Sequence, residues 1–477
     1  MPKKLLLCFC LIGILACGNV LAQEGAEDDL GGFESVSTQA SDEGFDELGG
    51  FDTPSLPHAK EQSTLPQTKD IFSLSGDLAF KTSVGFIKHE VDGIEYSGVN
   101  QAQTSLYLQL DSKLSDKYKL KISGDMFYDA IYDIYSTNDY RDDITDAYKT
   151  QLRLDDTYIQ GRLASKIDLK VGRQIVVWGK SDSIRVTDVI NPLDNRLPGM
   201  TDIEDLRLSV AMAKLDYYLG MWNLSAMIIG ESRIMLEAPP RSEFFPVDEV
   251  FPAAPDPFIE LVAPESSLEN MQFAFAANGV FSGWDLSFYA ADVLDQKWHI
   301  NPQTLKREVG KVKMLGSAVN IVQGSWLLKS EIALLDGVKY NSTTDAKSRF
   351  DALVGVDYMG ITDTVLSLEV ASRHIFEYEA QMSRLVSRPD YVDENELQTA
   401  LRFTRSFSHD TINASALLTM FGGMWEYGGF ARVWVEYDLA DGLSANIGVV
   451  DYIDGERPII KTNKDNDRIF TDITYSF

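Results

Sequence analysis

The chain is poor in the residues that carry most catalytic and metal-binding chemistry. It has three cysteines in 477 residues, Cys8, Cys10 and Cys17, all near the start of the chain. Its five histidines are scattered, and none has the spacing of paired metal ligands. Gly-x-Ser-x-Gly, phosphate-loop and dinucleotide motifs are absent. We therefore expect no cofactor, no metal and no catalytic site. The enzymatic alternative is a membrane-embedded hydrolase, whose Ser, His and acid would be brought together by geometry and not by sequence order.

Long hydrophobic runs are also missing. After position 22, no segment approaches the roughly 18 consecutive apolar residues of a membrane-spanning helix. Residues 1–22 combine Lys3 and Lys4 with a short apolar run and small residues ending at Ala22, which predicts a cleaved signal peptide. A competing, lipoprotein-like site would leave a lipidated Cys17. Cleavage after Ala22 removes every cysteine and excludes disulfides and thiolate chemistry.

Positive charge is scarce. The chain has 43 Lys and Arg against 72 Asp and Glu, a formal net charge of −29. Loss of Lys3 and Lys4 with the signal makes it −31 (−29 − 2). Nucleic acid is excluded as a partner on this balance. The hydrophobic fraction of 44% fits a soluble protein, but it also fits a membrane β-barrel, whose strands are only half apolar.

Residues 23–70 differ in composition from the rest of the chain. They hold twelve acidic residues and two lysines, which predicts a disordered periplasmic leader. Asp-Asp-Leu-Gly-Gly-Phe at 28–33 returns as Asp-Glu-Leu-Gly-Gly-Phe at 46–51, eighteen residues later. We interpret the two copies as docking motifs for a periplasmic or inner-membrane transporter partner; the alternative is a duplication in an inert spacer. Their apolar anchors are Leu30, Phe33, Leu48 and Phe51.

From residue 71 to 477, apolar and polar residues alternate with a period of two. Runs of this kind are typical of strands with one apolar and one polar face. Eight short breaks alternate with nine longer polar segments, which predicts an all-β fold: a transmembrane antiparallel β-barrel of 18 strands, with 16 as the fallback. Short periplasmic turns and long external loops would place it in the bacterial outer membrane, surrounded by lipid, with leader and both termini periplasmic. The short breaks lie near 112–117, 164–166, 219–221, 282–283, 323–325, 359–362, 408–410 and 440–442.

The last strand supports the barrel. Its alternate positions are apolar up to the terminal aromatic residue, and only Phe470 breaks the pattern. Such an ending resembles the closing strand that the barrel-assembly machinery recognises; the alternative is an ordinary amphipathic edge strand. The predicted closing residues are Ile469, Ile473, Tyr475 and Phe477.

The stretch 171–208 is the most distinctive part of the chain. It contains Gly172-Arg173-Gln174, then Trp178-Gly179, then Asn191-Pro192-Leu193-Asp194. These elements resemble a domain-of-unknown-function family of proteobacterial outer-membrane β-barrels, often encoded beside RND-type (MMPL-like) exporters. The resemblance covers about 71–477 and carries no known active residues. It implies an outer-membrane partner in moving hydrophobic or lipid-like cargo.

The same stretch is rich in charges of both signs. Charges facing lipid would cost about 2–4 kcal/mol each at mid-bilayer, so they should point into the lumen or lie in a folded loop. We predict that loop 179–204 folds inward as a constriction held by ion pairs; the alternative is an external loop with solvated charges. The residues are Arg173, Lys180, Asp182, Arg185, Asp188, Asp194, Arg196, Glu204, Asp205 and Arg207.

Proline is concentrated in one place. Seven of the chain's sixteen prolines lie in loop 236–266, together with four phenylalanines, Phe244, Phe245, Phe251 and Phe258. Exposed rings would be a liability unless they cover something. The loop is therefore a candidate lid or hydrophobic entry platform at the pore mouth, and the alternative is packing against neighbouring loops.

These observations favour an outer-membrane channel or transporter. The RND-type partner and the hydrophobic cargo follow from the resemblance alone. A non-conducting structural or receptor barrel is the main alternative, and the hydrolase ranks below it.

Overall fold

The computed structural model of the protein describes residues 72–135, 140–253, 255, 258–384 and 390–477. Eighteen strands form its wall. They are β1 (Phe72–Gly85), β4 (Gly98–Lys113), β5 (Tyr118–Asp129), β6 (Thr150–Ala164), β7 (Ile167–Gln174), β9 (Val210–Leu219), β10 (Trp222–Ile229), β13 (Gln272–Phe281), β14 (Trp284–Ile300), β15 (Arg307–Gln323), β16 (Trp326–Val338), β17 (Lys347–Ile361), β18 (Thr364–Ile375), β19 (Asn395–Phe407), β20 (Ile412–Phe421), β21 (Gly428–Ala440), β22 (Leu443–Ile453) and β23 (Arg468–Ser476).

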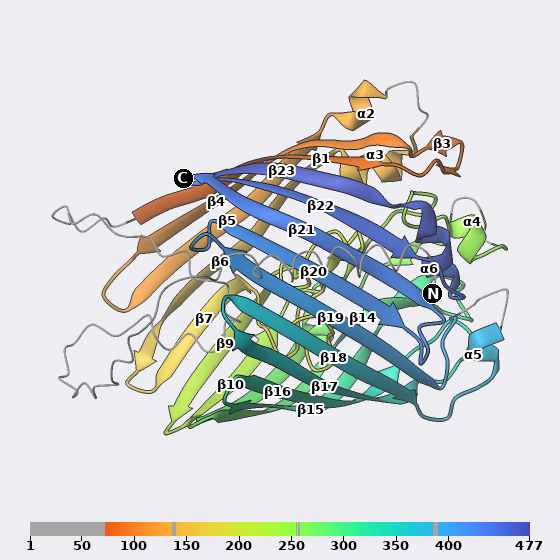
Figure 1. Ribbon diagram of the computed structural model, residues 1–477. Coiled ribbons are helices and arrows are strands. Elements are labelled where there is room, and N and C mark those ends of the chain that lie inside the picture. Colours follow the sequence, from red (N-terminus) through yellow and green to blue (C-terminus); the bar gives the residue numbers. More distant parts are fainter. Residues whose placement is uncertain (1–71, 136–139, 254, 256–257, 385–389) are drawn as a thin grey trace.

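Each wall strand pairs antiparallel with its neighbours in the chain, and the sheet closes on itself (Figure 1). The closing pair is β1 with β23, from Asp77 opposite Ser476 to Gly85 opposite Arg468. The 18-strand antiparallel barrel predicted from the sequence is confirmed.

The connections also follow the predicted alternation. Eight tight turns join strands at the end where the described chain starts and stops, at the left of Figure 1. Gly283 and Gly324 sit in two of them with φ +81° and +60°, a backbone conformation that side-chain-bearing residues rarely adopt. The other end carries the long connections. Their short elements are β2 (Glu90–Val91), β3 (Ile94–Glu95), β8 (Asp194–Asn195), β11 (Leu236–Glu237), β12 (Leu261–Val262), α2 (Ile131–Ile134), α3 (Asp142–Tyr148), α4 (Val247–Val250), α5 (Gln381–Arg384), α6 (Pro458–Thr462), and the 3-10 turns η1 (Leu268–Asn270) and η2 (Asn463–Asp465).

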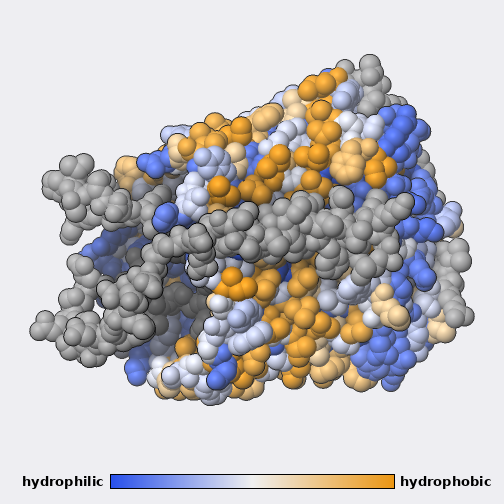
Figure 2. Space-filling view, viewed as in Figure 1, coloured by the Kyte–Doolittle hydropathy of each residue, from blue (hydrophilic) through white to orange (hydrophobic). Residues whose placement is uncertain are grey.

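The strands have one apolar outer face and one inner face of mixed chemistry. On β16, Leu328 and Ile332 are 45% and 46% exposed on the outside, whereas Lys329 and Glu331 are 5% and 2% exposed on the inside. In Figure 2 the hydrophobic residues gather over the middle of the wall, and the long-loop end is largely hydrophilic. Among the described residues, none of the helices is long and apolar enough to cross a membrane.

Two long connections leave the wall and pack inside it. The first joins β7 to β9 and spans residues 175–209; we call it the inserted segment. The second joins β10 to β13 and spans residues 230–271. The first packs against inner residues of β13 to β19, and the second against β14, β22 and β23. The predicted signal peptide, the acidic leader and its four apolar anchors lie outside the described residues.

Candidate functional site: the lumen and its inserted segment

A large cavity of about 4490 Å³ occupies the lumen. Its lining runs from the short-turn end, at Lys117 and Gly442, to the inserted segment, at Trp178 and Asp202. Side chains of both charges line it. Within the described part of the chain, residues 236–266 contribute nothing to the lining, so the cavity stops short of that connection.

The base of the inserted segment is held by one buried amide, Asn191. The backbone N–H of Val176 donates to Asn191 Oδ1 at 2.8 Å. Asn191 Nδ2 donates in turn to the carbonyl oxygens of Gln174 at 3.2 Å and Leu208 at 2.8 Å. The side chain thereby ties together the two points where the segment leaves and rejoins the wall.

From this base the segment crosses the lumen. Glu331 on β16, six strands round the wall from β7, receives four of its groups. The backbone N–H groups of Lys180 and Ser181 donate to Oε1 at 2.5 and 2.8 Å. The Thr187 N–H and hydroxyl donate to Oε2 at 3.1 and 2.8 Å. A carboxylate this deeply buried is tolerated because both oxygens are satisfied.

A second buried carboxylate, Glu369 on β18, holds the adjacent turn. It accepts hydrogen bonds from the Ser181 hydroxyl at 2.6 Å and from the N–H groups of Asp182 and Ser183 at 2.8 and 3.0 Å. The side chain of Glu369 is 1% exposed. Because β18 lies eight strands from β7 in a barrel of eighteen, this contact reaches nearly to the opposite wall.

Lysines complete the attachment. Lys329 on β16 pairs with Asp182 of the segment and with Asp357 on β17, the latter at 2.7 Å. Lys180 Nζ lies 3.2 Å from Asp285 on β14. The wall thus supplies both acids and a base to one short stretch of the segment, residues 180–187.

The apolar side of the attachment depends on small wall residues. Trp178 stacks on Tyr289 with ring centroids 4.7 Å apart. The wall facing the segment is rich in alanine, which leaves room for it; the buried alanines are Ala274, Ala276, Ala291, Ala318, Ala333, Ala371 and Ala400. Gly179 has φ +93°, and a Cβ there would lie 2.7 Å from Glu331 Oε1. A Cβ on Gly316 would lie 2.9 Å from Thr187. Both glycines are therefore needed for the inserted segment to lie this close to the wall.

Further along, the segment is braced by its own charges. Asp188 Oδ2 accepts a hydrogen bond from Arg207 Nε at 2.9 Å and forms an ion pair with Arg185, whose Nε lies 3.1 Å away. The side chains of Asp188 and Arg207 are mostly buried, and this triad joins the two halves of the segment. Arg373 on β18 also donates to the carbonyl of Arg185 at 3.3 Å.

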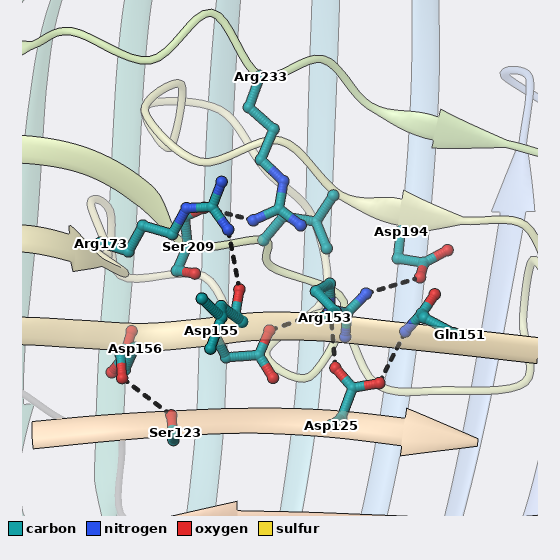
Figure 3. A network of polar contacts seen from close by, with 12 residues as sticks. Ser123, Asp125, Gln151, Arg153, Asp155, Asp156, Arg173, Asp194, Ser209 and Arg233 are labelled. Carbon is teal, nitrogen blue, oxygen red and sulfur yellow. Dashed lines mark hydrogen bonds and ion pairs between the residues drawn. The ribbon is translucent and has the colours of Figure 1, made fainter.

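The far half of the segment contacts β6. Arg196 Nε donates to Asp194 Oδ1 at 2.8 Å, and its NH2 donates to Gln151 at 2.6 Å. Arg153 lies between Asp194, at 3.2 Å, and Asp125 on β5, at 2.8 Å (Figure 3). This network fixes the segment to the wall beside its starting strand.

The last stretch of the segment presents acids to the lumen. Asp202 pairs with Arg402 on β19 at 2.9 Å and with Arg432 on β21. Asp205, in the connection and outside the strands, is accessible from the cavity. Enclosure by the barrel and the neighbouring Glu204 and Asp202 raise the pKa of Asp205 to about 6. Its charge therefore changes just below neutral pH.

Nine of the ten predicted charged residues lie on the inserted segment. Arg173 is different: it is the penultimate residue of β7 and pairs with Glu231, just after β10, at 3.1 Å. Lys180 lies on the segment, but it forms an ion pair with an acid of the wall, Asp285 on β14.

Sequence reasoning missed the wall residues that hold the segment. They are Asp285, Lys329, Glu331, Asp357, Glu369, Arg402 and Arg432. The available signal was a charged residue at an inward position of a strand, but such residues also line any water-filled barrel. Nothing in the sequence pairs them with residues of the inserted segment more than 100 positions away.

The phenylalanines of the second connection are buried. Phe244, Phe245, Phe251 and Phe258 are 3–8% exposed and pack with Trp298 of β14 and Tyr452 of β22. We call them the aromatic cluster. The expected exposed entry platform is therefore wrong, since packing against neighbouring elements hides the rings. Phe470, the exception to the alternation of the last strand, belongs to the same buried group.

The remaining predicted residues lie on the closing strand. Ile469, Ile473, Tyr475 and Phe477 are 43–50% exposed on its outer face. The backbone of Phe477 exchanges two hydrogen bonds of 3.0 Å with Gly76 on β1. Among the described residues, no group of three or more His, Cys, Asp and Glu side chains is arranged to hold a metal ion.

Solved structures share this fold. OccAB3 of Acinetobacter baumannii superposes with a TM-score of 0.51 over 85% of this chain and 99% of that chain, at 11% identity. The outer membrane protein opdK of Pseudomonas aeruginosa gives 0.49, with coverage of 85% and 99% at 12% identity. At 11% identity the likeness to OccAB3 shows the fold alone. No curated protein sequence matches the chain.

A family model covers the whole barrel. The model of DUF1302, described as "Protein of unknown function", matches residues 60–477, including the inserted segment and the closing strand. The match confirms the resemblance to a family of unknown function. The chain belongs to the DUF1302 family.

Proposed function

We propose that the protein is an outer-membrane channel or transporter whose passage is narrowed by the inserted segment. The observation that carries this is the large lumenal cavity with charged walls, crossed by a segment fastened to nearly opposite sides of the barrel. The short turns share one end with Phe72 and Phe477. In outer-membrane barrels that end is periplasmic, so the acidic leader would extend into the periplasm.

Single-channel conductance of the purified protein in planar bilayers tests the proposal. We expect measurable conductance, and a larger value when residues 179–204 are replaced by a short Gly-Ser linker. A matched control shortens the exposed connection between β14 and β15, residues 301–306, and should leave conductance unchanged. Absence of conductance in both the full chain and the linker variant would contradict the channel.

The finer proposal concerns cargo and partner. The family resemblance supports a hydrophobic or lipid-like cargo and an RND-type inner-membrane partner, reached through the repeated motif of the leader. Changing the four anchors to Ser keeps every carboxylate. It should abolish cross-linking to a periplasmic or inner-membrane partner while conductance stays normal. Unchanged cross-linking would reduce the repeat to a spacer. The altered residues are Leu30, Phe33, Leu48 and Phe51.

One observation favours a second candidate, a non-conducting structural or receptor barrel. The aromatic cluster packs across the long-loop end, where an open pore would need a mouth. The conductance measurement separates the two candidates directly.

A further inference from the structure

Four neighbouring strands of the wall are shorter than the two strands that flank them, and β7 and β10 are the shortest strands of the wall. β7 and β10 have 8 residues, and β9 and β13 have 10, whereas the flanking β6 and β14 have 15 and 17. A tilted strand needs about 9–11 residues to cross the apolar layer. At β7 and β10 the wall is therefore lower than a membrane crossing requires.

The edge of β6 is open at this place. β6 pairs with β5 from Thr150 to Gly161, but with β7 only from Thr157 to Ala164. Residues 150–156 thus have a strand neighbour on one edge only. The register with β5 also shifts here, and Asp155 and Asp156 fall outside the ladder. Bulges bend strands. Pairing with β5 resumes beyond this bulge and continues to Thr150, whereas pairing with β7 ends at Thr157.

The outer surface beside this open edge is apolar. Leu152 and Leu154 of β6 are 83% and 55% exposed, and both lie beyond the last β7 pairing at Thr157. Tyr128 on β5, opposite Thr150 and half-exposed, lies further up the wall and has the amphipathic ring typical of the membrane boundary. The apolar outer surface of β6 therefore continues beyond Thr157, the last residue of β6 that pairs with β7.

Side chains close the gap in place of a ladder. Arg173 donates from NH1 to the carbonyl of Leu154 at 3.1 Å and pairs with Glu231. Arg233 donates from NH1 to the carbonyl of Ser209 at 2.6 Å. Figure 3 shows Arg173 and Arg233 side by side above β6, with Arg153 close by. We call Arg173, Glu231 and Arg233 the polar latch.

The inner side of the gap opens on the lumen. Gln151, Arg153 and Asp194 line the large cavity, and all three lie behind the unpaired stretch of β6. Backbone groups facing lipid are costly unless satisfied, and charged groups at that depth are costly too. A wall closed by a few ion pairs can open without breaking a strand ladder.

From this geometry we infer that the gap between β6 and the ends of β7 and β9 is a lateral portal. Through it the apolar chain of a lipid-like molecule moves between the membrane and the lumen. The polar latch holds the portal shut. This inference rests on the proposed lipid-like cargo, and it adds the route by which such cargo enters or leaves the barrel.

Photo-crosslinking in liposomes tests the portal. The probe is a sixteen-carbon fatty acid that carries a diazirine at the end of its chain, and labelled residues are located by mass spectrometry. We expect labels on Leu152 and Leu154 outside and on Gln151 and Arg153 inside. The matched control is β17, a fully paired strand, where Val354 should be labelled and Leu353 should not.

Two distributions of label would overturn the inference. Label confined to outward residues on both strands would show that the gap stays closed to lipid. Label spread over lumen residues far from the gap, such as Asn446, would show entry through the aqueous lumen. If conductance is normal but the inner residues Gln151 and Arg153 carry no label, the portal is contradicted and the proposed channel is supported. If these inner residues are labelled but no conductance is measured, the portal is supported and the proposed channel is contradicted.

Variants of the latch sharpen the test. Arg173→Ala removes the bond to Leu154 and should raise inner labelling several-fold at unchanged conductance. Should that variant not fold into a heat-modifiable barrel, Glu231→Gln weakens the same pair while keeping an acceptor for the Ala211 N–H, and the same rise is expected. Arg162→Ala removes an arginine where β6 and β7 are paired and should change nothing. A rise in the Arg162 variant, or none in the latch variants, overturns the role of the latch.

Discussion

Glu331 and Glu369 place two carboxylates inside the barrel where side chains have almost no contact with water. Each is satisfied by backbone N–H groups of a segment that begins on a distant strand. The energetic asymmetry of such sites is large: the bonds stabilise modestly when made, but a buried group left without its partner costs about 1–3 kcal/mol. The inserted segment is therefore held in one position.

Glu331→Gln tests this arrangement. The amide replaces one acceptor with a donor facing other donors, so at least one N–H of the segment loses its partner, at a local cost of about 1–3 kcal/mol. We expect larger and noisier single-channel currents, with the barrel still folded. Asp438→Asn, a lumen carboxylate near the short turns, is the control and should leave the current noise unchanged. Equal noise in both variants would show that Glu331 does not position the segment.

Asp205 gives the lumen a pH response. Because its pKa is raised to about 6, the carboxyl is charged at pH 7 and above and becomes neutral as the pH falls through 6. Loss of a lumenal negative charge should lower the preference for cations between pH 7 and 5. Reversal potentials in a salt gradient measure this, and Asp205→Asn should flatten the response. A wild-type response that persists in this variant would assign it to another group.

Residue identity predicted only part of the site. The Arg196–Asp194 and Arg207–Asp188 pairs lie within about twenty positions, so alternating charges in one stretch indicated them. The Asp182–Lys329 pair joins positions 147 apart, and only the closed barrel brings them together.

At the scale of elements, the period of two predicted the strands and turns well, because lipid outside a barrel demands alternation on each strand. The two long connections were harder. Their composition showed that they had something to bury, but the surface that receives them is formed by strands distant in the chain. For the same reason, the burial of the phenylalanines could not be predicted from their spacing.

The aromatic cluster makes its own prediction. Phe251 packs against Phe258 and Trp298, with ring centroids 5.6 and 6.3 Å apart. Phe251→Ala removes a buried ring, a change that costs about 3–5 kcal/mol. We expect the second connection to become sensitive to added protease in folded barrels, as measured by cleavage of intact liposome-embedded protein. Phe376→Ala, an exposed ring on another long connection, should not alter cleavage. If the second connection of Phe251→Ala resists protease as well as that of the native chain, the aromatic cluster does not hold this connection closed.

At the scale of the whole molecule, closure depends on the β1–β23 pair. Phe477 adds two backbone hydrogen bonds to that seam and an outward ring stacked on Tyr475. Deleting Phe477 should strongly lower the amount of heat-modifiable barrel in the outer membrane, because it removes both of these backbone hydrogen bonds from the seam. Normal levels of folded barrel would disprove that role. Phe72→Ser, which changes an outward ring of β1 at the same end of the barrel, is the control.

The alanine-lined half of the wall has a further consequence for the order of folding. The inserted segment docks on β14, β16 and β18, all of which lie between its own strand and the final seam in the sequence. Docking needs none of the pairing between β1 and β23. We therefore expect the segment to dock on the concave side of a sheet whose edges are still apart. Such docking would bring the two edge strands towards each other, so the residues that hold the segment would also favour closure of the barrel.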